Sequence, residues 1–272
     1  MKLADLHLHT NFSDGTFSPA ELVEEAKKAG LFCISVTDHD SVAAIDEVKK
    51  EAADSLEVIE GIELSAEIIS NEVHILGYFI NPNYPRLQTE LKKIYEIRRQ
   101  RVYDMCEKLK KLNIDLEPQE VFDISGKATA SRLHIAMAML AKGKITNIYE
   151  AFSRYIGNKK PAYVGKFSLN PMDAIKLIKE AGGIPVLAHP YATKCDELIP
   201  SFVKAGLRGL EAYYPEHSEI VTNHYLRIAD KYGLLVTGGS DCHGTAKPDV
   251  GVGKVSIPYE LVEKLKEEKR GR

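Results

Sequence analysis

Short apolar runs that each follow an amphipathic stretch and a glycine recur along this chain and predict repeated helix–strand units. In the first unit, residues 18–21 (Ser-Pro-Ala-Glu) have the pattern of a capped helix start, and apolar residues follow at helical spacing up to Gly30. The next run, 31–36, has no helical period and is short enough for a buried strand. We therefore expect a helix over 19–29 and then a strand. Before this unit, the alternation of residues 3–9 predicts a strand with one polar face.

Three further units repeat the same order in the second half of the chain. Their apolar strands are expected at 184–188, 209–214 and 234–237. Each of these strands ends in a polar turn with a histidine, and these are His189, His217 and His243. Repeated units of this kind predict a parallel sheet, and right-handed crossovers place the carboxyl ends of its strands on one side. We therefore expect the histidines to gather at one rim of an α/β barrel.

The middle of the chain interrupts this order. Residues 85–164 form long charged stretches with helical periodicity and contain no comparable strand. This predicts a helical insertion over 85–164 in a barrel domain formed by 1–84 and 165–272.

The amino-acid composition limits the cellular compartments and the binding partners that suit this chain. The 272 residues contain 36 Lys and Arg against 39 Asp and Glu, so the formal charge of −3 gives no basic excess for binding duplex nucleic acid. No apolar run is long enough to cross a membrane. The four cysteines form no C-x-x-C pair, which favours a reduced cytoplasm. No assembly motif is visible, and we expect a monomer.

His7 and His9 are two residues apart on the first expected strand, so both imidazoles can reach one metal ion. An isolated pair of this kind is about as often two hydrogen-bonded surface histidines. Further ligand types fall at or just beyond the expected ends of strands: Asp14, His39, Glu63, His74, His189, Asp241 and His243. Nitrogen together with carboxylate oxygen suits Mn²⁺, Fe²⁺ or Zn²⁺. Their common position favours a metal centre.

Four short motifs carry a family resemblance. They are 7–10 (His-Leu-His-Thr), 37–40 (Thr-Asp-His-Asp), 188–190 (Ala-His-Pro) and 240–243 (Ser-Asp-Cys-His). In this order they resemble the motifs of the PHP (polymerase and histidinol phosphatase) superfamily, and the resemblance covers nearly the whole chain apart from the insertion. It implies a distorted, TIM-like (β/α)7 barrel that binds two or three divalent metal ions and hydrolyses phosphoesters.

The resemblance also implies how the ligands are shared. A first metal would be held by His7, His9, Glu63 and Asp241. A second would be held by Glu63 with His74 and His189, and a third by Asp14, His39 and His243. Hydroxide formed at the metals would attack phosphorus in line. Asp5 and Asp38 would either orient imidazole N–H groups or bind backbone, and both readings remain open. Cys242 is expected to point away from the metals.

Candidates for substrate binding lie outside the metal ligands. Arg132 and His134 stand where a helix could begin, and an Arg and a His at a helix N-terminus suit a phosphate, although a solvated Arg and a partly buried His would fit as well. Lys160, Tyr163, Tyr214 and His217 lie in segments that resemble parts of the family that face the active site. His217 is our candidate for leaving-group protonation or phosphate contact, and Arg132 is the second catalytic candidate.

The order of the motifs and the insertion resembles the nucleotidase (TrpH-like) branch of the family. This implies removal of a terminal phosphate from small nucleotides such as nucleoside 3′,5′-bisphosphates, or trimming of short RNA from its 5′ end, with the insertion as a substrate lid. A histidinol-phosphate phosphatase is an alternative. An amidohydrolase-like C–N hydrolase would usually have a lysine at a strand end, which is not found here. An inactive metal-binding regulator would show gaps in the ligand set, yet every expected position is filled.

Overall fold

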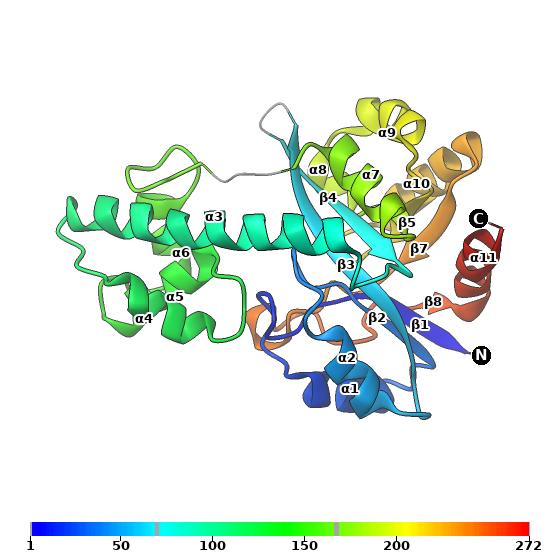
Figure 1. Ribbon diagram of the computed structural model, residues 1–272, viewed down its shortest axis with the longest axis horizontal. Helices are drawn as coiled ribbons and strands as arrows, with labels where there is room; N and C mark the ends of the chain where they lie inside the picture. The colour runs from blue at the N-terminus through cyan, green and yellow to red at the C-terminus, as the bar shows by residue number, and fades with distance from the viewer. Residues whose placement is uncertain (1, 69–70, 166–168, 272) are drawn as a thin grey trace. The chain divides into compact units, whose positions relative to one another are not determined.

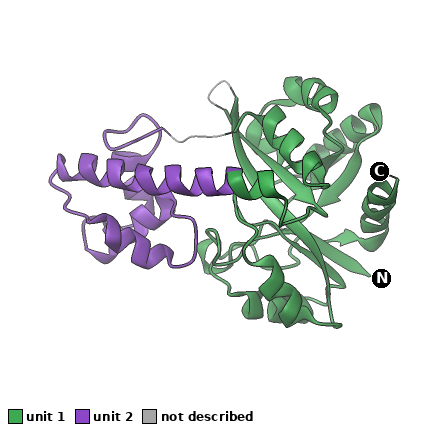
Figure 2. Ribbon diagram, viewed as in Figure 1, with its two compact units in different colours: residues 1–89, 168–272 green, residues 90–167 purple. Residues whose placement is uncertain are grey.

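Residues 2–68, 71–165 and 169–271 are described by the computed structural model, which divides into two units (Figure 1, Figure 2). Unit 1 consists of Met1–Thr89 and Ser168–Arg272, and unit 2 consists of Glu90–Phe167. None of the described helices is both long and apolar enough to cross a membrane.

A sheet of eight strands forms the centre of unit 1, in the order β7-β6-β5-β4-β3-β2-β1-β8. The strands are β1 (Leu3–Leu8), β2 (Cys33–Val36), β3 (Glu57–Ile68), β4 (Asn71–Tyr78), β5 (Ile184–Leu187), β6 (Gly209–Tyr213), β7 (Leu235–Gly238) and β8 (Ile257–Pro258). β1, β2 and β3 are mutually parallel, and so are β5, β6 and β7.

The expectation of a wholly parallel sheet is wrong for two strands. β4 runs antiparallel to β3 and β5, and β8 runs antiparallel to β1. Only two residues separate β3 from β4 along the chain. A parallel pair needs a crossover of about a dozen residues or more, so this short connection allows only the antiparallel arrangement.

Helices surround the sheet of unit 1 (Figure 1). They are α1 (Pro19–Lys28), α2 (Ile45–Ala52), α7 (Pro171–Glu180), α8 (Pro190–Thr193), α9 (Ile199–Ala205), α10 (Glu219–Tyr232) and α11 (Tyr259–Arg270). α1 begins where its sequence predicts, because the Ser18 side chain accepts from the Glu21 backbone N–H and the Glu21 carboxylate accepts from the Ser18 N–H. α10 begins at Glu219, because Ser218 caps it by accepting from the Val221 N–H.

The barrel is nearly closed because the segment after β7 returns to β1. The Asp241 backbone N–H donates to the His7 carbonyl at 2.8 Å, and the His9 N–H donates to the Cys242 carbonyl at 3.1 Å. These bonds extend the strand pattern across the seam between the first and the last parallel strand. Strands and helices together form the distorted barrel that the sequence predicts, and the fold class is confirmed.

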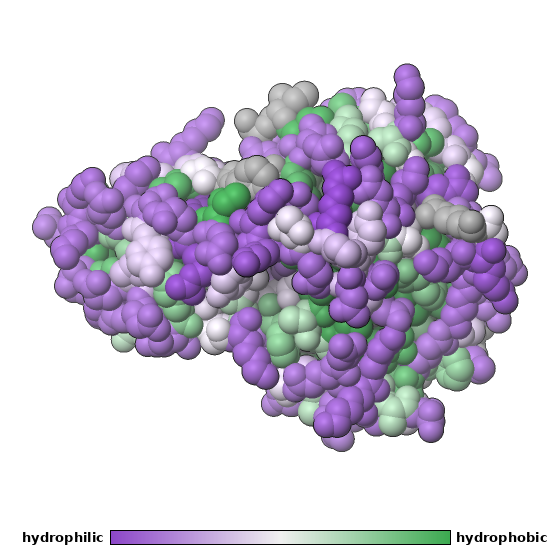
Figure 3. All heavy atoms as spheres, viewed as in Figure 1, coloured by the Kyte–Doolittle hydropathy of each residue, from purple (hydrophilic) through white to green (hydrophobic). Residues whose placement is uncertain are grey.

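Unit 2 consists of helices joined by turns and irregular segments, and its described residues, 90–165, contain no strand. α3 (Pro85–Lys110) begins in unit 1 and continues into unit 2, and it is followed by α4 (Pro118–Ser125), α5 (Arg132–Ala141), α6 (Ile148–Glu150) and a π-helix (Ala151–Ile156). Unit 2 has an apolar core of its own, which includes Met105, Leu109, Val121, Ile135 and Met139. On the face drawn in Figure 3, hydrophilic side chains cover most of the surface of both units.

The seam depends on a glycine at its start. A Cβ on Gly239 would lie 2.4 Å from the backbone nitrogen of His7 and 2.6 Å from its Cβ. We expect Gly239→Ala to lower the free energy of unfolding by about 1–3 kcal/mol, because overpacked atoms must shift. Gly251→Ala is the matched control, since its Cβ would meet nothing within 4 Å. Urea denaturation measures both variants, and equal midpoints would contradict this account of the seam.

Candidate metal centre

Glu63 in β3 is fully buried, and imidazoles from several strands and strand ends surround its carboxylate. Its Oε2 atom lies 3.2 Å from His7 Nε2, 3.2 Å from His9 Nε2 and 3.0 Å from His39 Nδ1. Its Oε1 atom lies 2.9 Å from His74 Nδ1 and 3.1 Å from His189 Nε2. One carboxylate therefore lies within contact distance of histidines from β1, from the end of β2, from β4 and from the end of β5.

Two further carboxylates complete the cluster. Asp241 Oδ1 is 3.1 Å from His9 Nε2, and Asp14 Oδ1 is 3.2 Å from His243 Nε2. Three groups of ligand atoms each lie within 4.8 Å of one another: His7, His9, Glu63 and Asp241; His9, Asp14, His39 and His243; His39, Glu63 and His74. The structure thus brings together all nine residues that the sequence proposes as metal ligands.

The backbone places some of these residues differently from the expectation. Glu63 and His74 lie inside β3 and β4 rather than at strand ends, because both strands continue past the rim as an antiparallel pair. His189 and Asp241 lie where expected, with positive φ angles of 26° and 52°. Non-glycine residues rarely adopt such angles, and they persist where the surrounding structure enforces them, often at functional sites.

Three imidazoles of the cluster are held from outside, each by its second ring nitrogen. His7 Nδ1 lies 2.9 Å from Glu211 Oε1, His74 Nε2 lies 3.1 Å from Glu72 Oε1, and His243 Nδ1 lies 2.8 Å from the Asp241 carbonyl. With an acceptor on the outer side, the proton of a neutral imidazole stays there. The lone pair of the other nitrogen then points into the cluster.

The inward-facing atoms fit a bound cation. Among the described residues, the buried atoms without a hydrogen-bond partner include five that face into the cluster: His7 Nε2, His9 Nε2, His39 Nδ1, Asp14 Oδ1 and Glu63 Oε2. Buried polar atoms without partners are rare in proteins, and these five are ligand types for divalent metals. The cluster can therefore bind metal ions.

Without a bound metal, protonated histidines supply the positive charge that compensates the buried carboxylates. Burial opposes protonation of His9, but Asp241 and Glu63 outweigh it and raise the pKa of His9 to about 9. Burial likewise opposes protonation of His74, and Glu63 raises its pKa to about 9. Burial would raise the pKa of Glu63, but the neighbouring histidines hold it well below its usual value. Protons and metal ions therefore compete for the same atoms.

Glu211 was not found from the sequence. It lies in β6, is fully buried, and contacts His7 through its carboxylate. A glutamate within the short apolar run 209–214 was the available signal, because a buried charge needs partners. Of the two readings left open for Asp5 and Asp38, the contacts agree with binding of backbone rather than of imidazole N–H groups. Asp5 accepts from the backbone N–H groups of Ser240 and Gly253, and Asp38 from the backbone and hydroxyl of Thr10 and from Ser13.

Tyr214 and His217 lie beside the cluster on the segment that follows β6. The Tyr214 hydroxyl donates to Asp241 Oδ2 at 2.9 Å, and Lys247 Nζ donates to the same oxygen at 2.7 Å. His217 Nδ1 lies 2.9 Å from the Ala212 carbonyl, so this nitrogen holds the proton of the neutral ring. Burial lowers the pKa of His217, which favours the neutral form. Its Nε2 can then accept a hydrogen bond but cannot donate one.

The other four substrate-binding candidates lie in unit 2. The Arg132 guanidinium stands 5.7 Å from the ring centre of Tyr163 and donates to the Asn158 side chain at 2.8 Å. His134 is buried, and its Nδ1 accepts from the backbone N–H of the capping residue Ser131 at 3.0 Å. Lys160 is exposed. Unit 2 thus brings Arg132 and Tyr163 together, while His134 has a helix-capping contact.

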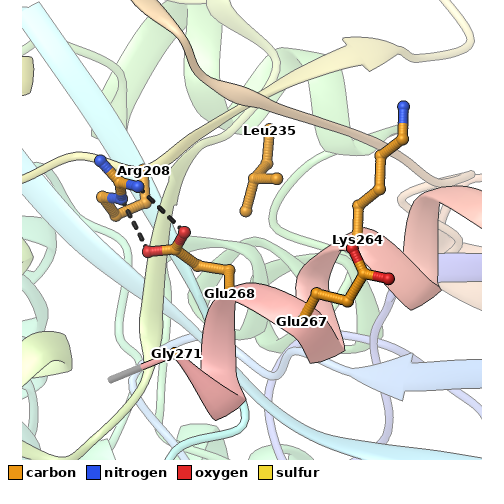
Figure 4. Close-up of a pocket in the computed structure, with 6 residues that line it drawn as sticks. All are labelled: Arg208, Leu235, Lys264, Glu267, Glu268 and Gly271. Carbon is orange, nitrogen blue, oxygen red and sulfur yellow. Dashed lines mark hydrogen bonds and ion pairs between the residues drawn. The ribbon is translucent and has the colours of Figure 1, made fainter.

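A separate pocket of about 670 Å³ lies beside the C-terminal helix α11 (Figure 4). Its lining residues are Arg208, Leu235, Lys264, Glu267, Glu268 and Gly271. The Arg208 guanidinium binds both carboxylate oxygens of Glu268 at 2.9 Å. The pocket contains none of the predicted site residues, and its arginine is already paired.

Comparisons with known proteins agree with this geometry. The sequence profile of the PHP domain matches residues 5–158. A 5′-3′ exoribonuclease of Haemophilus influenzae is 32% identical over 252 residues, which cover 89% of this chain and 90% of the relative. A 3′,5′-nucleoside bisphosphate phosphatase of Chromobacterium violaceum is 32% identical over 260 residues, which cover 91% of this chain and 90% of the relative.

A solved structure extends the agreement to three dimensions. One match is a crystal structure described as that of a metal-dependent phosphoesterase from Bifidobacterium adolescentis. Its chain matches this one with a TM-score of 0.88 and 31% sequence identity, and the match covers 96% of this chain and 94% of that one. These comparisons confirm the predicted fold class and the predicted enzyme class, a hydrolase of phosphoesters. The profile spans more than half of the sequence and the relatives nearly all of it, so the chain belongs to the PHP domain family.

Proposed function

We propose that this protein is a metal-dependent phosphohydrolase that removes a terminal phosphate from small nucleotides, such as nucleoside 3′,5′-bisphosphates, or trims short RNA from its 5′ end. The observation that carries the proposal is the buried cluster of imidazoles and carboxylates, in which five inward atoms lack hydrogen-bond partners among the described residues. The names of the two bacterial relatives, an exoribonuclease and a bisphosphate phosphatase, support the substrate class.

In this proposal the nine residues hold two or three divalent ions, Mn²⁺, Fe²⁺ or Zn²⁺. His7, His9, Glu63 and Asp241 form the first site; Glu63, His74 and His189 form the second; Asp14, His39 and His243 form the third. When bound, such ions lower the pKa of water and offset charge on phosphoryl oxygens. Three carboxylates contribute −3, so two or three dications leave the centre positive and suited to a phosphate.

The chain's own groups complete the proposed chemistry. Tyr214 and Lys247 hold Asp241 Oδ2, which leaves Oδ1 directed at the imidazoles. His217 accepts a hydrogen bond from the substrate through Nε2, a contact role that its neutral ring favours over proton donation. Protonation of the leaving group would require the less stable imidazolium form of His217.

In this proposal the polar side chains of unit 2 contribute further substrate contacts. The guanidinium of Arg132, positioned over Tyr163, binds phosphate oxygens that are not being transferred, and Lys160 and His134 contribute to the same anion. The four cysteines are buried and free, which fits the reducing cytoplasm that we propose as the setting of a monomeric enzyme.

A substrate panel tests the function. Chelated protein reloaded with Mn²⁺, Fe²⁺ or Zn²⁺ is assayed for phosphate and nucleotide release from adenosine 3′,5′-bisphosphate, 5′-phosphorylated short RNA and histidinol phosphate. We expect turnover of the nucleotide substrates and little of histidinol phosphate. Turnover of histidinol phosphate alone would select the alternative phosphatase, and no turnover under any of the three metals would refute the proposal.

Single substitutions separate metal binding from substrate binding. His9→Ala should lose metal and turnover together, because it removes a buried donor. Arg132→Ala should keep its metal content and lower kcat/KM by about 10- to 100-fold, as expected for a hydrogen bond to a charged group worth about 1.5–3 kcal/mol. His224→Ala and Arg154→Ala, both outside the cluster, are the matched controls. Metal analysis and steady-state kinetics would contradict this division if both test variants lost metal equally.

The raised histidine pKa values predict a pH dependence of stability. His9 and His74 have folded-state pKa values of about 9, above the ordinary 6.5, so their protonation stabilises the metal-free fold fully below pH 6.5. This contribution is lost as the pH rises toward 9. The melting temperature of chelated protein should therefore fall over this range, while Mn²⁺-loaded protein should not show that fall. Parallel melting curves with and without Mn²⁺ would contradict the competition between protons and metal.

A further inference from the structure

We propose that Glu211 is a positioning residue that holds donors of two different metal sites at once, through the imidazole of His7 and the backbone of His189. This inference rests on the proposed metal binding and adds a residue to it. The Glu211 side chain lies in β6 and is fully buried. Its two oxygens have separate partners: Oε1 lies 2.9 Å from His7 Nδ1, and Oε2 accepts from the His189 backbone N–H at 2.7 Å.

The first contact sets the tautomer of His7. A neutral imidazole has one N–H, and an ionised carboxylate can only accept a hydrogen bond. The proton of His7 therefore stays on Nδ1, facing Glu211. Nε2 then presents its lone pair toward Glu63 Oε2 at 3.2 Å and Asp241 Oδ1 at 3.5 Å. A carboxylate at this position also makes the imidazole a stronger ligand.

The second contact holds His189 in an unfavourable backbone conformation. A φ of 26° is unfavourable for a non-glycine residue, so neighbouring contacts must maintain it. A hydrogen bond from the His189 N–H to a carboxylate is charge-assisted and therefore strong. Within the part of the chain that the structure describes, His189 Nδ1 is buried without a hydrogen-bond partner. Glu63 contacts the inner nitrogen of the ring, so on its outer side the ring is positioned through its backbone, which Glu211 helps to hold.

The location of the two contacts explains why one residue can serve both. β6 pairs with β5, whose end leads to His189, on one side and with β7 on the other, and the seam places β1 with His7 next to the segment after β7. The Glu211 side chain bridges the two. His7 belongs to the first proposed metal site and His189 to the second, while Glu63 contacts both histidines from the opposite side. Loss of Glu211 should therefore weaken both sites.

Glu211→Gln tests this with little change in size. The amide has no charge, and its NH₂ group must face either His7 Nδ1 or the His189 N–H, so one of the two contacts is lost. We expect Mn²⁺ affinity to fall about 10- to 100-fold, the range for loss of a group that orients a metal ligand. Chelated protein is titrated with Mn²⁺ by calorimetry, and retained metal is counted after dialysis. Glu24→Gln, an exposed carboxylate on α1, controls for the loss of charge.

The outcomes separate positioning from a purely structural role. A lower melting temperature with wild-type Mn²⁺ affinity would overturn the proposal, and so would equal affinity losses in Glu211→Gln and Glu24→Gln. A measurement on the unmodified protein covers the case in which Glu211→Gln does not fold. Nitrogen-15 histidine spectra of Zn²⁺-loaded protein should show His7 with its proton on Nδ1, and a His7 Nδ1 without a proton would also overturn it.

These readouts are independent of turnover. If the phosphohydrolase proposal fails, the substrate panel stays inactive while Glu211→Gln still binds Mn²⁺ more weakly than the unmodified chain. If the inference on Glu211 fails, Mn²⁺ affinity is unchanged in Glu211→Gln whether or not phosphate is released.

Discussion

The burial of the Glu63 carboxylate among five imidazoles is the constraint on which the rest of the site depends. A carboxylate without access to water is stable only when positive charge and hydrogen-bond donors surround it. Here that requirement is met by residues from β1, β4 and the segments after β2 and β5. No short stretch of sequence contains enough compensating groups, so the cluster requires the assembled barrel. The same arrangement leaves donor atoms directed at a common centre, where metal ions can replace protons.

The elements that the sequence predicts well are those whose signals are local. Ser18 caps α1 through contacts within three residues of the cap, and such contacts depend little on the remainder of the fold. The direction of β4 could not be read in this way. An apolar alternating stretch has the same pattern whether its strand runs parallel or antiparallel to its neighbours, and only the brevity of the connection to β3 distinguishes the two.

The candidate site shows the same division between local and distant information. His7, His9 and the 240–243 motif could be identified because residue type and spacing within each motif carry the signal. The sequence could not show which carboxylate faces which imidazole. Asp5 and Asp38 stand near the histidines in sequence, yet they bind backbone N–H and hydroxyl groups, while Glu211 contacts His7 from 204 residues away. Hydrogen-bond partners of this kind depend on how the barrel closes, which sequence spacing does not encode.

The seam of the barrel has a mechanical consequence. The strand-like segment that follows β7 closes the barrel against β1 and also carries Asp241 and His243, which stand next to His9 in the cluster. A cation bound there by His9 and Asp241 would act as a removable cross-link between chain positions more than two hundred residues apart, and closing so long a loop restricts the unfolded chain strongly. Chelation would thus loosen the barrel at its seam before it affects the apolar layers, so that metal supply governs rigidity as well as chemistry.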